Sequence, residues 1–382
     1  MNLDEARKKI DNIDAQLVKL FEDRMNAVLE VARYKKENGL VVFDATREEA
    51  VLARVQSSVS PALADYAVSF WQSLMELSKS LERRTMATGA PGIQKIRELA
   101  ACAKKPIAHP RVAVQGVAGA YAHQAATQLY PDGDISFVER WADVFYALRD
   151  GNCDYGVLPV ENSNVGSVSE VYDLMQKFRF YIVKAYPLPV KHCLLGVRGA
   201  SLHDIRKVCT IPIAFMQCSD FFKKHHRITQ LPVTNTAVAA QYIARLGDKT
   251  CAALCSRECA QLYGLDILAE NIQQTSTNCT RFISISRHLE IPDNANKISL
   301  LFTLPHVTGS LHRTLAHFAH RGLNLTKIES RPNPDKNFEY VFYLDLTGKL
   351  TMPSTAELLG TLQDELLVFH FLGNYYEPKP EA

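Results

Sequence analysis

The chain has 382 residues, of which 47% are hydrophobic, and its 43 basic residues nearly balance 41 acidic ones to give a net charge of +2. This length allows two or three domains with separate apolar cores. The balanced charge, without a long basic run, argues against a nucleic-acid-binding or membrane-surface protein. We find no signal peptide and no stretch of about 18 consecutive apolar residues, so we expect a cytoplasmic protein.

The cysteines show no metal-binding pattern. None of the nine forms a Cys-x-x-Cys pair, and the evenly spaced Cys251, Cys255 and Cys259 have no histidines at zinc-site spacing. We therefore expect reduced, structural cysteines and no bound metal.

The first 86 residues are predicted to form three helices. They are expected from residue 3 to about residue 38, from Thr46 and from about Ala64, because no strand-like alternation interrupts this segment. Asp44 is placed to cap the second helix. Arg47 and Glu48 follow in the first turn of the second helix, and Ser78 and Glu82 interrupt the apolar stripe of the third helix.

Three cations lie on the apolar stripe of the first helix. Alternating steps of four and three residues from Leu3 pass through Arg7, Arg24 and Lys35. An unpaired buried cation costs several kcal/mol, so these groups require carboxylates or an anionic ligand. The alternative is that they extend from the edge of an ordinary coiled coil or pair with Asp14 and glutamates.

The length of this helix separates its cations. At a rise of about 1.5 Å per residue, Arg7 and Lys35 lie about 42 Å apart, whereas Arg24 and Lys35 lie about 16 Å apart. One small anion contacts all three only if Arg7 comes from a second, antiparallel copy of the helix. We therefore expect a homodimer or a higher homo-oligomer.

This polar set and its spacing across three helices resemble the AroQ-type chorismate mutase domain. The resemblance implies rearrangement of chorismate to prephenate by orientation and electrostatics, without a cofactor. It also implies that Lys35 and Glu82 are catalytic and that Arg7 comes from the partner chain. The implied chorismate-binding residues are Arg7, Arg24, Lys35, Asp44, Arg47, Glu48, Ser78 and Glu82.

Glu82 departs from the pattern of bifunctional relatives, which commonly have a glutamine that donates to the ether oxygen of chorismate. An ionised carboxylate cannot donate a hydrogen bond. We therefore expect Glu82 to be protonated at a buried, oxygen-facing position and mutase activity to favour acid pH.

The pattern of expected helices and strands changes twice along the rest of the chain. Residues 1–88 are assigned to the helical domain, and a linker is predicted at residues 89–108, which contain Gly89, Pro91 and Gly92. Short apolar strands then alternate with helices over residues 109–287, as is typical of an α/β domain. Residues 296–376 follow the strand, helix, strand, strand, helix, strand order of a ferredoxin-like α+β domain.

Four motifs of the α/β segment together resemble prephenate dehydratase over about residues 110–285. A glycine turn at residues 116–121 lacks the full dinucleotide-binding pattern and by itself indicates a tight turn. The other motifs are Leu-Pro-Val-Glu-Asn-Ser at 158–163, Gly-Ser-Val at 166–168 and Thr-Arg-Phe at 280–282. The resemblance implies two α/β lobes, with the Thr-Arg-Phe triplet lining a cleft between them.

The same resemblance implies roles for individual residues. Thr280 is expected to contact the hydroxyl that leaves prephenate, and Arg281 to bind a carboxylate. Thr210 belongs to a Thr-Ile-Pro-Ile sequence that departs from the Ser-His-Pro-Gln of many relatives, and Glu161 is an alternative proton source. The implied prephenate-binding residues are Asn162, Ser163, Thr210, Gln217, Arg281 and Phe282.

Two motifs of the last segment resemble the ACT regulatory domain. Gly309-Ser310-Leu311 corresponds to its Gly-Ala-Leu motif, and Glu329-Ser330-Arg331-Pro332 to its Glu-Ser-Arg-Pro motif. The resemblance implies feedback inhibition by L-phenylalanine bound between two chains. The alternative is that Glu329 and Arg331 only pair on a surface turn.

Together these segments predict a bifunctional chorismate mutase and prephenate dehydratase of phenylalanine biosynthesis. One alternative is arogenate as the substrate of dehydration, and residues beside Thr280, such as Asn278, do not assign that specificity. Others are an amino-acid sensor without catalysis and an enzyme in which only one of the two sites is active.

Overall fold

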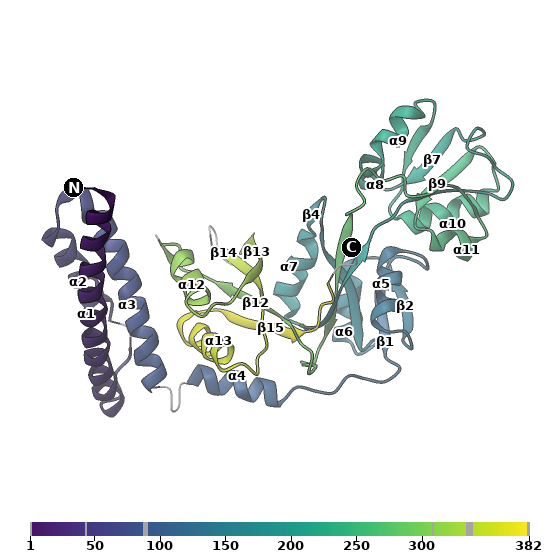
Figure 1. Ribbon diagram of the computed structural model, residues 1–382. Helices are drawn as coiled ribbons and strands as arrows, with labels where there is room; N and C mark the ends of the chain where they lie inside the picture. Colours follow the sequence, from purple (N-terminus) through teal and green to yellow (C-terminus); the bar gives the residue numbers. More distant parts are fainter. Residues whose placement is uncertain (1, 43, 87–90, 308, 334–338, 380–382) are drawn as a thin grey trace. The chain divides into compact units, whose positions relative to one another are not determined.

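The computed structural model describes residues 2–42, 44–86, 91–307, 309–333 and 339–379 (Figure 1). Part of the predicted linker, residues 89 and 90, lies outside the described residues, and the domain boundaries stay predictions. The residues group into two compact units, which we describe separately. The first contains Met1–Glu98, Val307–Arg321 and Pro353–Glu365, and the second contains Leu99–His306, Gly322–Met352 and Leu366–Ala382.

The first unit is helical in its described residues. Asn2 begins the first helix with a capping box, in which its side chain accepts from the N–H of Glu5 and its own N–H is bound by the Glu5 carboxylate. Asp44 caps the second helix by accepting from the N–H of Arg47 at 3.0 Å, so the predicted cap is confirmed. The helices are α1 (Leu3–Glu37), α2 (Ala45–Ser58), α3 (Ala64–Met86), most of α4 (Pro91–Ala101), α12 (Ser310–Ala319) and α13 (Pro353–Glu365), with a 3₁₀ turn at Pro61–Leu63.

Helices α4 and α13 approach each other so closely that two glycines are needed at the contact. A Cβ atom on Gly92 would lie 2.2 Å from the carbonyl oxygen of Gly360. A Cβ atom on Gly360 would lie 2.3 Å from Cγ1 and 2.8 Å from the backbone nitrogen of Ile93. Because backbone atoms cannot move aside without shifting the helix, we infer that neither position accepts a side chain.

We expect Gly360→Ala to destabilise the chain. Alanine has a higher helix propensity, worth about 1 kcal/mol. Overpacking of a tight contact costs about 1–3 kcal/mol, and here the clash includes backbone, so the cost should exceed the gain. Urea unfolding of Gly360→Ala measures the net effect, with Gln56→Ala on the exposed face of α2 as control. A raised unfolding midpoint for Gly360→Ala would contradict the close contact.

The second unit contains two α/β lobes. The first lobe has strand order β2-β1-β3-β11-β5, with β4 paired to β3, and the second has β10-β6-β9-β7-β8. The first lobe comprises β1 (Arg111–Gln115), α5 (Tyr121–Leu129), β2 (Asp134–Val138), α6 (Trp141–Arg149), β3 (Tyr155–Asn162), β4 (Gly166–Ser167), α7 (Ser169–Phe178), β5 (Tyr181–Pro189) and β11 (Cys279–Ser286). The second comprises β6 (Cys193–Gly196), β7 (Lys207–Thr210), α8 (Pro212–Gln217), α9 (Ser219–Lys224), β8 (Thr229–Pro232), α10 (Thr236–Leu246), β9 (Cys251–Cys255), α11 (Glu258–Tyr263) and β10 (Asp266–Ala269).

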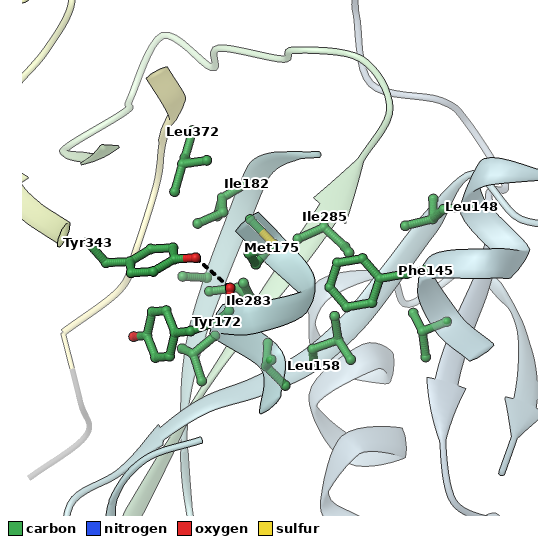
Figure 2. Close-up of a cluster of buried hydrophobic side chains, with 14 of the residues drawn as sticks. Phe145, Leu148, Leu158, Tyr172, Met175, Ile182, Ile283, Ile285, Tyr343 and Leu372 are labelled. Carbon is green, nitrogen blue, oxygen red and sulfur yellow. Dashed lines mark hydrogen bonds between the residues drawn. The ribbon is translucent and has the colours of Figure 1, made fainter. Parts of the chain in front are cut away.

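A third sheet of the second unit, the C-terminal sheet, packs on the first lobe. Its order is β13-β14-β12-β15, and its strands are β12 (Lys297–Thr303), β13 (Leu325–Pro332), β14 (Tyr340–Thr347) and β15 (Phe369–Tyr375). Figure 2 shows the shared core, in which Tyr343 and Leu372 of this sheet meet Met175 and Ile182 of the first lobe. The rings of Tyr172 and Tyr343 meet edge to face at 4.7 Å.

Strand β15 also meets the backbone of β5. A Cβ atom on Gly373 would lie 2.1 Å from the carbonyl oxygen of Ile182, so only glycine fits there. The predicted fold class is therefore confirmed: a helical segment, a two-lobed α/β segment, and a last segment with the expected βαββαβ order. Among the described residues, no helix combines the length and the apolar character needed to span a bilayer.

Candidate active sites

Four residues of the predicted chorismate set come together between α1 and α3. The Arg24 guanidinium donates to the Ser78 hydroxyl. Lys35 Nζ donates to Glu82 Oε2 at 2.8 Å and to the carbonyl oxygen of Val42 at 2.8 Å. Ser78 and Glu82 are buried, and burial lowers the pKa of Arg24 while the charge of Glu82 opposes that shift. The arrangement places two cations beside one carboxylate in a partly desolvated position.

Glu82 is ion-paired as well as buried. Its Oε2 lies 2.8 Å from Lys35 Nζ. The expectation of a neutral carboxyl and of an acid pH preference stays a prediction.

The other predicted chorismate residues are exposed or have other partners. The Arg7 side chain is 67% exposed and is ion-paired with Asp4 at 3.9 Å. Asp44 caps α2, Arg47 is exposed, and Glu48 is ion-paired at 2.7 Å with the buried Lys79, which sequence reasoning missed. Many apolar side chains of α1 that share the predicted stripe with Arg7 are likewise exposed in the single chain: Leu3, Ile10, Leu17, Phe21 and Val31.

A second polar cluster consists of Asn162, Asn278 and Thr280. Thr280 of β11 lies directly opposite Asn162 of β3 in the antiparallel register. Asn162 Nδ2 donates to Thr280 Oγ1 and to Asn278 Oδ1, both at 2.9 Å. The Asn162 Oδ1 accepts the backbone N–H groups of Asn164 and Val165, which fixes the orientation of the amide. The Thr280 oxygen is therefore an acceptor within the cluster, and its hydrogen is left for another partner.

Asn278 contains an unsatisfied donor. The residue is 1% exposed, and among the described residues its Nδ2 has no hydrogen-bond partner. An unpaired buried polar group costs about 1–3 kcal/mol. The sequence named Asn278 only as a neighbour of Thr280, whereas the structure places it in the cluster with a donor that an incoming anion could satisfy.

The cluster lies where the chain passes between the two lobes. The N–H of Val190, just after β5, donates to the carbonyl oxygen of Asn278 on the returning segment, at 2.8 Å. The Ser163 hydroxyl accepts the N–H of Cys279 at 3.0 Å. Through this hydrogen bond Ser163, which follows β3, supports the cluster at the point where the chain crosses between the lobes.

A buried histidine connects the same crossing to both lobes. His192 lies between β5 and β6, and its Nδ1 is hydrogen-bonded to the Tyr121 hydroxyl of the first lobe at 3.1 Å. Its Nε2 is hydrogen-bonded at 2.8 Å to Gln217 of the second lobe. Gln217 was predicted, but His192 and Tyr121 were missed, because segments about 25 to 70 residues apart in sequence form the contact. The glycine turn at 116–121 also packs on the second lobe, where a Cβ atom on Gly119 would lie 2.9 Å from Cys259 Sγ.

Three predicted prephenate residues are directed away from this cluster. Thr210 is fully buried in the second lobe, and its hydroxyl donates to the carbonyl oxygen of Leu254 at 2.7 Å. Phe282 is buried in the core of the first lobe. Arg281 is directed toward the C-terminal sheet, where Asp345, Glu377 and Tyr375 accept its hydrogen bonds.

The predicted effector motifs divide between the two units. Gly309, with φ of 81°, precedes α12, so Ser310 and Leu311 begin that helix. On β13, Glu329 accepts from the Ser167 hydroxyl at 2.6 Å, and Arg331 is ion-paired with Asp173 at 3.1 Å. Glu329 and Arg331 therefore bind the first lobe, while Ser330 and Pro332 of the same strand are exposed.

Comparisons with known proteins match this architecture. The family model described as prephenate dehydratase matches residues 112–290, and the one described as chorismate mutase type II matches residues 6–83. Arogenate dehydratase/prephenate dehydratase 1, chloroplastic, from Arabidopsis thaliana is 37% identical over 281 residues, which cover 69% of this chain and 71% of that protein. The chain belongs to the prephenate dehydratase family. Because this prephenate dehydratase also matches the chorismate mutase model, it is bifunctional. The predicted function in phenylalanine biosynthesis is therefore confirmed for both domains.

Two solved structures are similar to this prephenate dehydratase. One is the prephenate dehydratase of Arthrobacter aurescens in complex with L-Phe, at 28% identity and a TM-score of 0.64, covering 69% of this chain and 89% of that one. The other is described as GqqA, a novel type of quorum quenching acylase, at 30% identity and a TM-score of 0.65, covering 70% of this chain and 98% of that one. Both extend over more of this chain than the dehydratase match at residues 112–290.

The buried His192 predicts a pH dependence for the stability of this prephenate dehydratase. Burial lowers the pKa of His192 below its ordinary value of 6.5, and the hydrogen bond to Gln217 opposes the shift. The unfolded chain therefore binds more protons than the folded chain at acid pH, and stability should be lost as the pH falls through about 6.5. Urea unfolding between pH 5 and 8 measures this loss, which should be smaller in His192→Gln. Equal slopes in the two proteins would contradict it.

Proposed function

We propose that chorismate binds between α1 and α3 and that Arg24, Lys35 and Arg7 of a second subunit hold it. Chorismate carries two carboxylates, and the site supplies cations that can pair with both. The rearrangement breaks an ether bond, so a cation beside the ether oxygen stabilises the charge that develops there. Lys35 is the candidate for this role, because its ammonium lies in the buried group with Arg24, Ser78 and Glu82.

The dimer is part of this proposal. A single chain leaves Arg7 exposed and far from Lys35 along one helix, and the exposed apolar side chains of α1 follow the same stripe. A second copy of the helix would cover that stripe and bring its Arg7 to the site. The α1 stripe therefore supports a homodimer in which each site uses both chains.

We further propose that prephenate is dehydrated at the cluster of Asn162, Asn278 and Thr280. Loss of the ring hydroxyl and of the ring carboxylate as CO2 makes the ring aromatic, so the protein must assist departure of hydroxide and hold an anionic substrate. The observation that carries the proposal is the hydrogen bond from Asn162 Nδ2 to Thr280 Oγ1, which turns the Thr280 hydrogen toward another acceptor. Asn278 Nδ2 supplies a second donor of the same cluster.

Prephenate, rather than arogenate, is the proposed substrate. Some of the plant relatives are named arogenate dehydratases, and others are named for both arogenate and prephenate. Each of these relatives matches 69% of this chain. This chain also carries the chorismate mutase match, and prephenate is the product of that reaction. The presence of a domain that makes prephenate supports prephenate as the substrate of the dehydratase domain joined to it.

L-Phenylalanine is the proposed inhibitor, and the last segment, with an ACT-like element order, is its proposed site. The similar structure from Arthrobacter aurescens contains L-Phe. In this chain Glu329 and Arg331 bind the first lobe directly, so a ligand that changes β13 would change contacts of the dehydratase. A cytoplasmic location stays a prediction, since some relatives are named as chloroplastic.

One experiment tests these proposals together. The purified chain is given chorismate, and prephenate and phenylpyruvate are followed separately with and without added L-phenylalanine. Both products should form, and L-phenylalanine should suppress phenylpyruvate. Accumulation of prephenate alone, with turnover of added arogenate, would replace the proposed substrate of dehydration. An unchanged rate at saturating L-phenylalanine would contradict the proposed inhibition.

A further inference from the structure

Two neighbouring residues at the start of β11 face opposite sides of the first-lobe sheet. Thr280 lies opposite Asn162 in the register with β3, and Arg281 lies opposite Glu161. Because successive side chains of a strand alternate between faces, Thr280 and Asn162 share one face, and Arg281 and Glu161 share the other. The candidate catalytic hydroxyl therefore lies directly behind a pair of charged residues.

The C-terminal sheet surrounds Arg281 with acceptors. Its Nη1 is ion-paired with Asp345 Oδ2 at 2.6 Å, its Nη2 donates to the Tyr375 hydroxyl at 2.8 Å, and its Nε contacts Glu377. The Arg281 side chain is only 14% exposed. All three nitrogen atoms of the guanidinium are thus engaged by residues of the C-terminal sheet and the residues just after it.

The charges around Arg281 are balanced within a buried group. Lys297 is ion-paired with Glu377, so two cations meet two carboxylates. Ser299 donates to Asp345 and is hydrogen-bonded to Tyr375 at 2.7 Å. Removal of one member of such a buried ion pair strongly destabilises the folded chain, because the remaining charge has no partner. The group therefore fixes Arg281 firmly to one place.

The partner strand β3 is held from the same side. Glu161 is ion-paired with Lys327 of β13 at 2.9 Å, and Lys327 also donates to the Ser167 hydroxyl at 2.9 Å. Both strands that carry the Asn162–Thr280 hydrogen bond are thus attached, on their reverse face, to the C-terminal sheet. A shift of that sheet would move the hydrogen-bonded pair.

We propose that Arg281 is a positioning residue of dehydration, which holds Thr280 in place through its ion pairs with Asp345 and Glu377. The proposal rests on the proposed role of Thr280. It replaces the expectation that Arg281 binds a carboxylate of prephenate, because its guanidinium is directed to the opposite face and its nitrogens are already engaged. Misplacement of a reacting group by about 1 Å can lower a rate by about 100-fold, so small movements of β11 suffice.

The test uses the full chain with Arg281→Lys and, separately, Asp345→Asn. Asparagine keeps the shape of Asp345 and removes its charge, so this variant decides the question if Arg281→Lys does not fold. We expect kcat for dehydration of prephenate to fall about 10- to 100-fold, with KM changed by about twofold or less. A rise of KM by about tenfold at unchanged kcat would instead show that Arg281 binds substrate and would overturn the proposal, as would unchanged kinetics.

Three controls accompany these variants. Urea unfolding of the same samples reports that the second unit is folded, whereas chorismate mutase activity reports only on α1 and α3, which carry its proposed residues. Arg111 forms another arginine–aspartate pair, with Asp154 at 2.8 Å, at the far end of the same sheet. Arg111→Lys alters that pair and should leave kcat unchanged. Thr280→Ala is measured in parallel, because full activity of that variant would refute the proposed dehydration site whatever the Arg281 variants show.

Discussion

Replacement of Thr280 by alanine should lower kcat for dehydration of prephenate by about 100-fold or more, the range typical of a lost proton donor. The change removes the hydroxyl that accepts from Asn162 and that is proposed to donate to the leaving group. It should leave chorismate mutase activity unchanged. Steady-state measurement of phenylpyruvate formation from added prephenate, alongside prephenate formation from chorismate, checks both statements.

A matched variant separates the hydroxyl from the shape of the side chain. Thr280→Ser keeps the hydroxyl and should retain most of the activity, whereas Thr280→Val keeps the shape and should resemble Thr280→Ala. If Thr280→Val remained active, the proton donor would have to be sought elsewhere, and Glu161 would be examined next. Its carboxylate is ion-paired with Lys327 and lies on the other face of the strand.

Mixing two inactive variants of the mutase should restore activity. Arg7→Ala and Arg24→Ala should each lose most mutase activity, because each removes a counter-charge of a substrate carboxylate. If Arg7 acts across the dimer, a mixed dimer contains one intact site and one doubly altered site. Random pairing of equal amounts of the two chains then gives about a quarter of the wild-type sites. The measurement is the initial rate of chorismate consumption after unfolding and refolding the two chains together.

A second mixture provides the control. Arg24 and Lys35 belong to the same half-buried group of one chain, so Arg24→Ala mixed with Lys35→Ala should stay inactive. Recovery in that mixture would show exchange or contamination rather than shared sites. Absence of recovery with Arg7→Ala would mean that Arg7 serves its own chain or no site at all.

The elements of this fold were predictable where pattern and local chemistry agree. Apolar periodicity and the Asp44 cap predicted helix bounds within a few residues, and short apolar runs predicted the α/β class of residues 109–287. Strand β5 is not evident from its sequence, because Pro187 and Pro189 interrupt its pattern. Proline is tolerated there because β5 is an edge strand of the first sheet, a position that depends on the whole fold. A short sequence window does not contain that information.

The candidate sites were predictable in part for the same reason. Motifs located Thr280 and Asn162, but they also assigned Arg281 to the same substrate. Strand alternation opposes that assignment, since adjacent residues of β11 face different sides, and this signal was present in the sequence. His192 had no such signal, because Tyr121 and Gln217 reach it only through folding of both lobes.

The attachment of the C-terminal sheet to the first lobe has a consequence for biosynthesis. Glu377 is made 96 residues after Arg281, and Leu372 and Gly373 are made long after Ile182, which they meet in the folded chain. At roughly 5–20 residues per second, a ribosome needs about 5–20 s for that interval. During this time the nascent dehydratase lacks part of its core and the counter-charges of Arg281. The first lobe therefore completes its core only after β15 has been made.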